Sequence, residues 1–263
     1  MKKFDIKKIG IILAILVVVV LAIVLLGKSL KGNVDDATLK EYEKITVDYY
    51  LNLTAGLNTS YDGVEALYEI DETKLENISD RQLLHVAIDY ITKEGKASAV
   101  DLGTLVMLYE DEYPDIAKSM IYKGEEIREA IKLLFGIENF PNPTIEADAT
   151  ALTNYIYLSE EDIYLVNGDY TNSLVDTNLI VDYSIVETTS KKDKIITTVA
   201  IAYAQKNAEK LTYATDRFGN NVVATDVSEF PTDKIDEFTK YEFTLTKSKD
   251  GKSYIFESAK KVK

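Results

Sequence analysis

Two runs of adjacent carboxylates are the best candidates in this sequence for a cation-binding or acid/base catalytic site. Neighbouring acids can hold a hard cation, or supply the acid and the base of a glycoside hydrolysis. Neither run has the alternating Asp and Asn, the central glycine and the distal glutamate of a calcium-binding loop. We therefore expect most of these acids to face solvent. They are Glu110, Asp111, Glu112, Asp115, Glu160, Glu161 and Asp162.

Histidine and cysteine offer little further chemistry. His85 is the only histidine, beside the apolar stripe of a predicted helix, and the chain has no cysteine. One imidazole excludes a metal site that needs two, and the lack of thiols excludes disulfides, iron–sulfur clusters, zinc–thiolate sites and thiol catalysis. The sequence also lacks the glycine-x-serine-x-glycine elbow of hydrolases and the glycine-rich loops that bind nucleotides. It assigns no catalytic, cofactor-binding or metal-binding residue, and no cofactor.

Tyrosine is the abundant aromatic residue, with 18 tyrosines and no tryptophan in the chain. Many of them fall on the apolar faces of predicted helices and strands, where the ring packs and the hydroxyl reaches the rim. We expect tyrosine to serve mainly in packing. The alternative is a tyrosine-lined groove on the sheet.

The N-terminal region contains a predicted membrane anchor. Residues 9–26 form an unbroken run of 18 residues without a charged or strongly polar side chain. A helix of this length reaches roughly 27 Å, close to the thickness of the hydrocarbon core. Four lysines precede the run and two follow it, which favours a cytoplasmic N-terminus and an extracellular C-terminal domain. The alternative, a cleaved signal peptide, has a shorter apolar region and a small-x-small exit, which residues 25–29 match poorly.

The rest of the chain is strongly acidic. Residues 1–31 hold six lysines and one aspartate, which leaves 24 basic and 43 acidic residues and a net charge of −19 in residues 32–263. Such a domain repels phosphate backbones, so we expect no nucleic-acid partner. An exported domain of this size without cysteine, in a chain rich in lysine, isoleucine, tyrosine and asparagine, suggests a Gram-positive bacterial surface.

Apolar spacing predicts helices in the first half. Thr38 and Glu41 have the spacing of a capping box, and Gly56 can end the helix that follows. Ser79 begins a second capping box, and Gly95 ends that helix, which is the clearest in the chain. Two further helices are predicted, one from residues 98–101 to Tyr109 and one from Glu125 to the residue before Gly136.

Alternation of apolar and polar residues predicts strands from about residue 155 onward. A closing hairpin turns at Asp250-Gly251, a dipeptide typical of two-residue hairpin loops. Amphipathic helices and one-sided strands both need a covering layer. The clearest predicted strands are residues 179–185, 195–203, 211–215, 221–227, 241–245 and 254–256.

These features predict an α+β fold with an N-terminal transmembrane helix, a helical subdomain and then a C-terminal antiparallel β-sheet. The predicted boundaries leave open whether the two halves cover each other or form two small domains. They are residues 1–8 for the cytoplasmic N-terminus, 9–26 for the transmembrane anchor, 27–37 for a linker, 38–143 for the helical subdomain and 144–263 for the antiparallel β-rich subdomain.

The leading functional hypothesis is a non-catalytic, membrane-anchored extracytoplasmic binding or interaction module of a bacterial cell surface. Its expected partners are the membrane, through residues 9–26, and a protein or small ligand of the cell envelope. One alternative is an anchored envelope hydrolase that uses carboxylate acid/base chemistry. The other is a structural subunit of an envelope complex. A pocket with two inward carboxylates favours the hydrolase, and an open tyrosine-rich groove favours the binding module.

Overall fold

The computed structural model describes most of the chain that follows the predicted anchor. Residues 9–26 and Gly56 lie outside the described residues. Among the residues that are described, no helix has the length and apolar character needed to cross a bilayer. The described residues are 34–51, 53, 71–147, 153–168, 179–207, 209–216 and 219–262.

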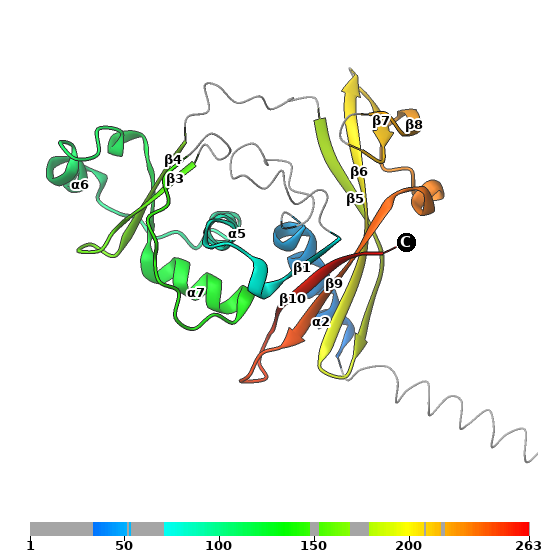
Figure 1. The fold of residues 1–263 in the computed structure, drawn as a ribbon, viewed down its shortest axis with the longest axis horizontal. Coiled ribbons are helices and arrows are strands. Elements are labelled where there is room, and N and C mark those ends of the chain that lie inside the picture. The colour runs from blue at the N-terminus through cyan, green and yellow to red at the C-terminus, as the bar shows by residue number, and fades with distance from the viewer. Residues whose placement is uncertain are drawn as a thin grey trace, which may run out of the picture.

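Two helices lie between a small sheet and a large sheet (Figure 1). They are α5 (Asp80–Lys93) and α7 (Gly124–Phe135), which pack against each other. Both sheets are antiparallel throughout. The combination of helices with antiparallel sheets confirms the α+β class. The small sheet has the order β2 (Met120–Lys123), β4 (Ile163–Gly168), β3 (Thr153–Leu158).

The large sheet is organised around its longest strand, β6 (Lys194–Asn207). One edge of β6 pairs first with β9 (Thr239–Lys247) and then with β7 (Lys210–Ala214), while β5 (Leu179–Lys191) follows the other edge. The predicted strand pairs and the closing hairpin are confirmed, and Gly251 has the positive φ of 72° that its turn requires. The other strands are β1 (Glu72–Lys74), β8 (Val222–Val227) and β10 (Tyr254–Val262).

The first described helix, α2 (Asp36–Ile45), begins earlier than its sequence pattern predicted. The capping box at Thr38 is wrong, because Asp35 is the N-cap. Thr38 lies in the first turn, and its backbone N–H donates to the Asp35 carboxylate at 2.9 Å. An aspartate at this position satisfies the free N–H groups as well as threonine does, and its charge also suits the positive end of the helix.

A π-helical turn, η1 (Thr46–Tyr50), continues α2. The Thr46 hydroxyl donates to the Tyr42 carbonyl at 2.7 Å, and the Leu51 N–H donates to the Thr46 carbonyl at 2.9 Å. The wider turn changes the helical phase, so that the adjacent Tyr49 and Tyr50 are both buried.

The remaining helices follow the local signals of the sequence. Ser79 and Gln82 form the predicted capping box of α5, and Asp101 caps α6 (Leu102–Tyr109). α7 ends at Gly136, whose left-handed φ of 69° makes it the expected stop. The described part of the chain also contains short 3-10 helices, namely η3 (Leu75–Asn77), η4 (Ile116–Lys118) and η6 (Thr232–Glu237).

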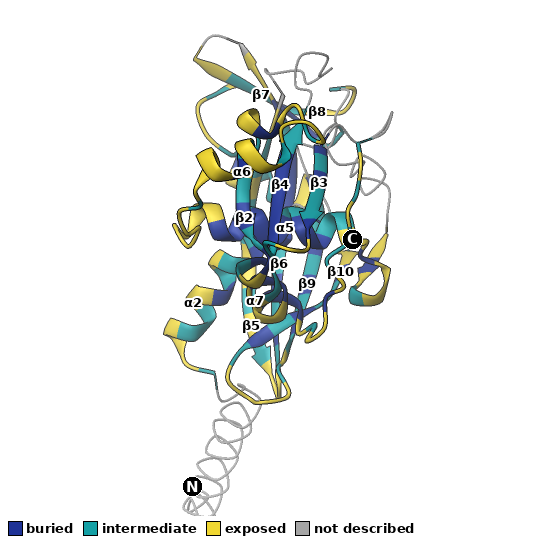
Figure 2. Cartoon of the chain, turned by 90° about the vertical axis from the view of Figure 1, so that its left-hand side faces the viewer, coloured by how far each residue is buried: buried dark blue, intermediate teal, exposed yellow. Residues whose placement is uncertain are grey.

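One core joins the small sheet, the helices and the large sheet. Tyr164 of the small sheet, Ile131 of α7 and Phe243 of the large sheet belong to the same buried cluster. Residues of both predicted subdomains, 38–143 and 144–263, therefore share one interior. Figure 2 shows the buried residues in this interior and the exposed surface of α6 beside the small sheet.

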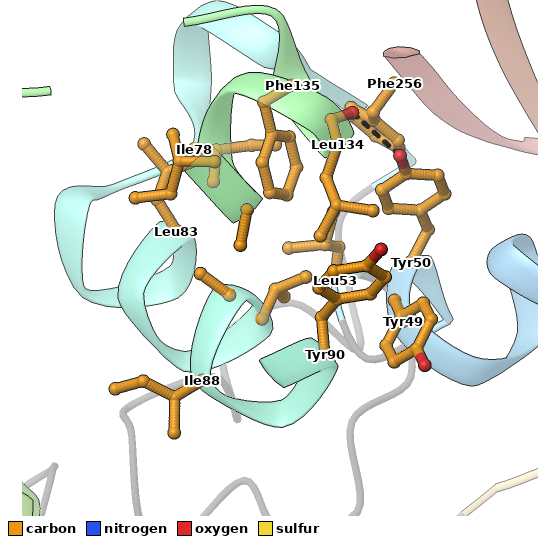
Figure 3. Packing of buried hydrophobic residues seen from close by; sticks show 14 of the residues in the cluster. Tyr49, Tyr50, Leu53, Ile78, Leu83, Ile88, Tyr90, Leu134, Phe135 and Phe256 are labelled. Atoms are coloured by element: carbon orange, nitrogen blue, oxygen red, sulfur yellow. Dashed lines mark hydrogen bonds between the residues drawn. The ribbon is translucent and has the colours of Figure 1, made fainter. Parts of the chain in front are cut away.

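Tyrosine supplies much of the core, as expected. Tyr50 lies between Phe135 and Phe256, with ring centroids 5.8 and 5.2 Å away, and its hydroxyl donates to the Leu134 carbonyl at 2.7 Å (Figure 3). Among the described residues, ten tyrosines are buried, namely Tyr42, Tyr49, Tyr50, Tyr90, Tyr122, Tyr155, Tyr164, Tyr213, Tyr241 and Tyr254.

Candidate functional site

The candidate site is a cleft of about 490 Å³ at one end of the small sheet. Three segments meet there: the start of α6, the junction of β2 with α7, and the turn between β3 and β4. Leu105 and Ile163 form an apolar floor that belongs to a satellite core under α6. The polar lining is Asp101, Thr104, Lys123, Glu125, Glu161 and Asp162.

Asp162 is held at the cleft by two partners. The Nη1 and Nη2 atoms of Arg128 donate to its two carboxylate oxygens at 2.7 Å each, and the Tyr157 hydroxyl donates to the same carboxylate at 2.7 Å. The bonds from Arg128, and then that from Tyr157, lower the pKa of Asp162, against the opposing effect of partial burial. This carboxylate is therefore ionised and already bonded.

Glycine at position 124 allows this pair to form. The Gly124 N–H donates to the Asp162 carbonyl at 2.7 Å, which holds the β3–β4 turn against the start of α7. A Cβ atom at position 124 would lie 2.2 Å from an Asp162 carboxylate oxygen and 2.9 Å from an Arg128 nitrogen. Only glycine fits this close approach.

The structure brings the two acidic runs together around Tyr109, the last residue of α6. The hydrogen bond to the Glu161 carboxylate raises the pKa of Tyr109 to about 12, with smaller effects from desolvation and from the charges of Glu160 and Glu112. The Oε2 atom of Glu161 is buried and has no hydrogen-bond partner among the described residues. One carboxylate oxygen of the second run is thus buried beside the cleft without a hydrogen-bond partner in the described chain.

Asp101 contributes a further bonded carboxylate. It accepts hydrogen bonds from the Thr104 hydroxyl at 2.7 Å and the Thr104 N–H at 3.3 Å, which lower its pKa. Arg128 balances the charge of Asp162. The remaining acids of the cleft outnumber its single lysine, Lys123; they are Asp101, Glu125 and Glu161. The cleft therefore suits a cationic or hydrogen-bond-donating group of a ligand.

None of the other predicted candidates lines this cleft. Residues 110–112 lie in an exposed turn, and Asp115 forms an ion pair with Lys118 at 2.9 Å. His85 is half-buried on α5. Within the described segments, no three His, Cys, Asp or Glu side chains are grouped so that they could hold a metal ion.

A second cleft, of about 390 Å³, lies between α5 and α7. Tyr90, Lys96, Glu126 and Leu133 line it, and the Lys96 ammonium lies 4.3 Å from the centre of the Tyr90 ring. With one tyrosine, it is not the predicted tyrosine-lined groove.

Sequence patterns missed Arg128, Tyr157 and Tyr109 as parts of the site. Arg128 falls on a solvent-facing position of an amphipathic helix, where an ordinary surface charge is expected. Its partner Asp162 is 34 positions away in the sequence. The one available signal was that arginine is rare in this chain, so that each arginine was worth matching with an acid. No local pattern connects Arg128 with Asp162.

No family model matches the chain, and no significant similarity to a curated protein or a solved structure is found.

Proposed function

We propose that this chain is a membrane-anchored, non-catalytic binding module whose domain faces the outside of a bacterial cell. The apolar run of residues 9–26, with its lysine-rich N-terminal flank, supports the anchor and its orientation. The cleft beside α6 is where the domain binds a basic group of its ligand.

The observation that carries the binding role is the state of the carboxylates in the cleft. Asp162 and Asp101 are both held ionised by hydrogen bonds that lower their pKa. A general acid needs a raised pKa, so these two residues suit charge recognition better than proton transfer. Glu161 adds a buried acceptor oxygen without a partner in the described chain, which an ammonium or guanidinium group can satisfy.

The hydrolase alternative makes a different demand on the same cleft. It requires one carboxyl to be essential and another group to titrate, which produces a bell-shaped pH dependence. Across the described residues, every Asp or Glu whose pKa departs clearly from its usual value has it lowered: Asp35, Glu94, Asp101, Asp162 and Asp250. In the cleft, these shifts disfavour Asp101 and Asp162 as the general acid that a hydrolase needs.

Orientation is tested first. Intact cells that carry a C-terminal epitope on the chain are treated with a protease, and a cytoplasmic protein serves as the control. Loss of the epitope with the control intact is expected. A protected epitope places the acidic domain in the cytoplasm and removes the main support for a surface module.

Ligand contact is tested by photo-crosslinking in living cells. A photoreactive residue at Thr104, in the cleft, is expected to yield an adduct, and the same residue at the exposed Thr225 of β8 is the control. The Glu161→Gln exchange keeps the size of the side chain and removes its charge, so it should weaken the Thr104 adduct. Equal adducts at both positions, or an adduct that Glu161→Gln leaves unchanged, would contradict a charge-recognising cleft.

A further inference from the structure

The outermost strand of the large sheet, β5, has one edge without a strand partner among the described residues. β5 pairs with β6 from Leu179 to Lys191, which spans roughly 40 Å at about 3.3 Å per residue. No described backbone group outside this pair hydrogen-bonds to residues 179–191. Alternate N–H and C=O groups of β5 therefore point outward along the edge. Within β5, the Tyr183 N–H also donates to the Asp182 carboxylate at 2.8 Å.

This edge has few of the features that normally block strand addition. Proteins protect edge strands with lysines, prolines, bulges or very short strands. β5 is long, contains no proline, and has its only lysine at its last position, Lys191. One bulge interrupts it at Val186. The edge also exposes apolar side chains, because Ile180, Tyr183 and Val186 are 37%, 37% and 39% exposed.

The two faces of the edge differ in chemistry. Asp182 and Glu187 lie opposite Ala202 and Thr198 of β6, so the bulge leaves both acids on the same face of the sheet. This face is opposite the main core and is partly covered by η6. The Tyr213 hydroxyl holds Asp182 there, at 2.5 Å.

The opposite face of β5 is apolar. Val181, Tyr183 and Ile185 lie opposite Tyr203, Ile201 and Val199 of β6, and Val181 packs against the main core. A strand added beside β5 would thus meet acids on one face and apolar side chains on the other.

We propose that the outer edge of β5 is a docking site for an extended segment of a partner protein in which basic and apolar residues alternate. The backbone of that segment continues the sheet, and its lysines or arginines lie beside Asp182 and Glu187. Its apolar residues cover Tyr183 on the other face. Recognition by added strands in general combines main-chain bonds with alternate side-chain contacts in this way.

Charge argues against two other occupants of the edge, a second copy of the chain and the long internal segments outside the described residues. A second copy would place acidic strands side by side in domains of net charge −19, and like charges disfavour pairing. Two segments of this chain outside the described residues, 54–70 and 169–178, contain five acids and neither lysine nor arginine. A basic partner is the complementary choice.

The test uses the full chain in a neutral detergent and a synthetic peptide of about nine alternating lysines and valines, long enough to cover most of β5. A second peptide has the same side chains, with alternate backbone nitrogens methylated so that one edge cannot pair. We expect the first peptide to bind and to slow amide exchange within residues 179–191. The methylated peptide should bind at least about tenfold more weakly, because the main-chain bonds are lost.

Matched variants locate the contact. Glu187→Lys reverses the charge beside the edge and should weaken peptide binding roughly fivefold to tenfold at low salt. Glu76→Lys makes the same change at an exposed position of η3, beside β1 and β10, and should leave binding unchanged. Both lysines replace exposed glutamates, so the fold should persist in each variant.

Three results would overturn the proposal. If the methylated peptide binds as tightly as the unmethylated one, the peptide is held by its net charge alone and not by main-chain pairing with β5. Slow exchange of the outward β5 amides in the absence of peptide shows that another part of the chain, or a second copy if the protection depends on concentration, already covers the edge. Protection outside residues 179–191 places the contact elsewhere. The edge of β5 is a different surface from the cleft beside α6, so this inference goes beyond the proposed function. The peptide test depends neither on orientation nor on the cleft, so either proposal can fail while the other stands.

Discussion

Two fully buried tyrosines differ in the environment of the hydroxyl, and we expect this difference to decide how much each hydroxyl contributes to stability. Tyr50 donates to the Leu134 carbonyl at 2.7 Å, whereas the Tyr164 hydroxyl has no partner among the described residues. Tyr50→Phe leaves that carbonyl of α7 without its donor and should lower the free energy of unfolding by about 1–2 kcal/mol. Tyr164→Phe removes an unsatisfied polar group and should leave stability unchanged or raise it by up to about 1 kcal/mol.

Urea unfolding of the two variants and the parent chain, followed by far-ultraviolet circular dichroism, measures this contrast. The two exchanges remove the same atom from fully buried rings, so loss of ring packing cannot explain a difference. A Tyr164→Phe variant that loses as much stability as Tyr50→Phe would show that the Tyr164 hydroxyl has a partner, such as a buried water.

Gly124 gives a second prediction for a single residue. Gly124→Ala places a Cβ within 2.2 Å of the Asp162 carboxylate, which Arg128 and Tyr157 hold in place, and overpacking of this kind costs about 1–3 kcal/mol. Gly103→Ala in α6 is the control, because the nearest atom to its Cβ lies 3.4 Å away and alanine favours a helix by up to about 1 kcal/mol. Thermal midpoints should fall for the first variant and stay or rise for the second. Equal midpoints would mean that the cleft relaxes around the methyl group without cost.

The Arg128–Asp162 pair acts between elements, because it joins α7 to the β3–β4 turn. The folded-state pKa of Asp162 is lowered, so its contribution to stability is present above the unfolded pKa of about 4 and is lost as the pH falls through the folded value. We therefore expect Arg128→Met to lower the thermal midpoint at pH 7. The difference from the parent chain should shrink as the pH falls below about 4, where the unfolded carboxyl protonates first.

Thermal unfolding of the two chains between pH 3 and 7 checks this expectation, with salt held constant. Lys118→Met, which removes an exposed ion pair with Asp115, is the comparison and should have little effect at any pH. A gap between Arg128→Met and the parent that is constant from pH 7 to pH 3 would assign the role of Arg128 to packing alone.

Elements with local signals were the ones that the sequence predicted well. The capping box at Ser79, the stop at Gly136 and the turn at Gly251 each depend on a few neighbouring residues, and each is confirmed. The π-helical turn was missed because it places Tyr50 off the stripe of a regular helix. Strand β2 was missed because its four residues pair only with β4, about forty residues later.

The candidate site was less predictable than the elements that build it. Both acidic runs were visible in the sequence, but their meeting at Tyr109 depends on the packing of α6 beside the β3–β4 turn. The free edge of β5 was equally hidden, since alternation predicts a strand and says nothing about its position in a sheet. Non-local pairing therefore decides the surface chemistry of this domain.

At the scale of the whole molecule, the shared core predicts cooperative unfolding of both sheets. Tyr164 of the small sheet and Phe243 of the large sheet belong to one buried cluster with α5 and α7 between them. Separating the sheets exposes both sides of that cluster, so neither is expected to keep its packing alone. Amide exchange at increasing urea should therefore show residues 163–168 and 241–245 losing protection over the same narrow range.

Helix α6 provides the internal comparison for this experiment. Only Leu105 of its eight residues is buried, and it belongs to the satellite cluster of the cleft and not to the main core. Residues 102–109 should open at lower urea than either sheet, since local opening follows the amount of buried apolar contact. If the two sheets instead lose protection in separate steps, the small sheet and the large sheet unfold as distinct units despite the core that they share. A single unfolding step for both sheets, together with earlier opening of α6, would show that the cleft lies beside the least stable element of an otherwise rigid domain. Such local mobility is common at ligand-binding sites.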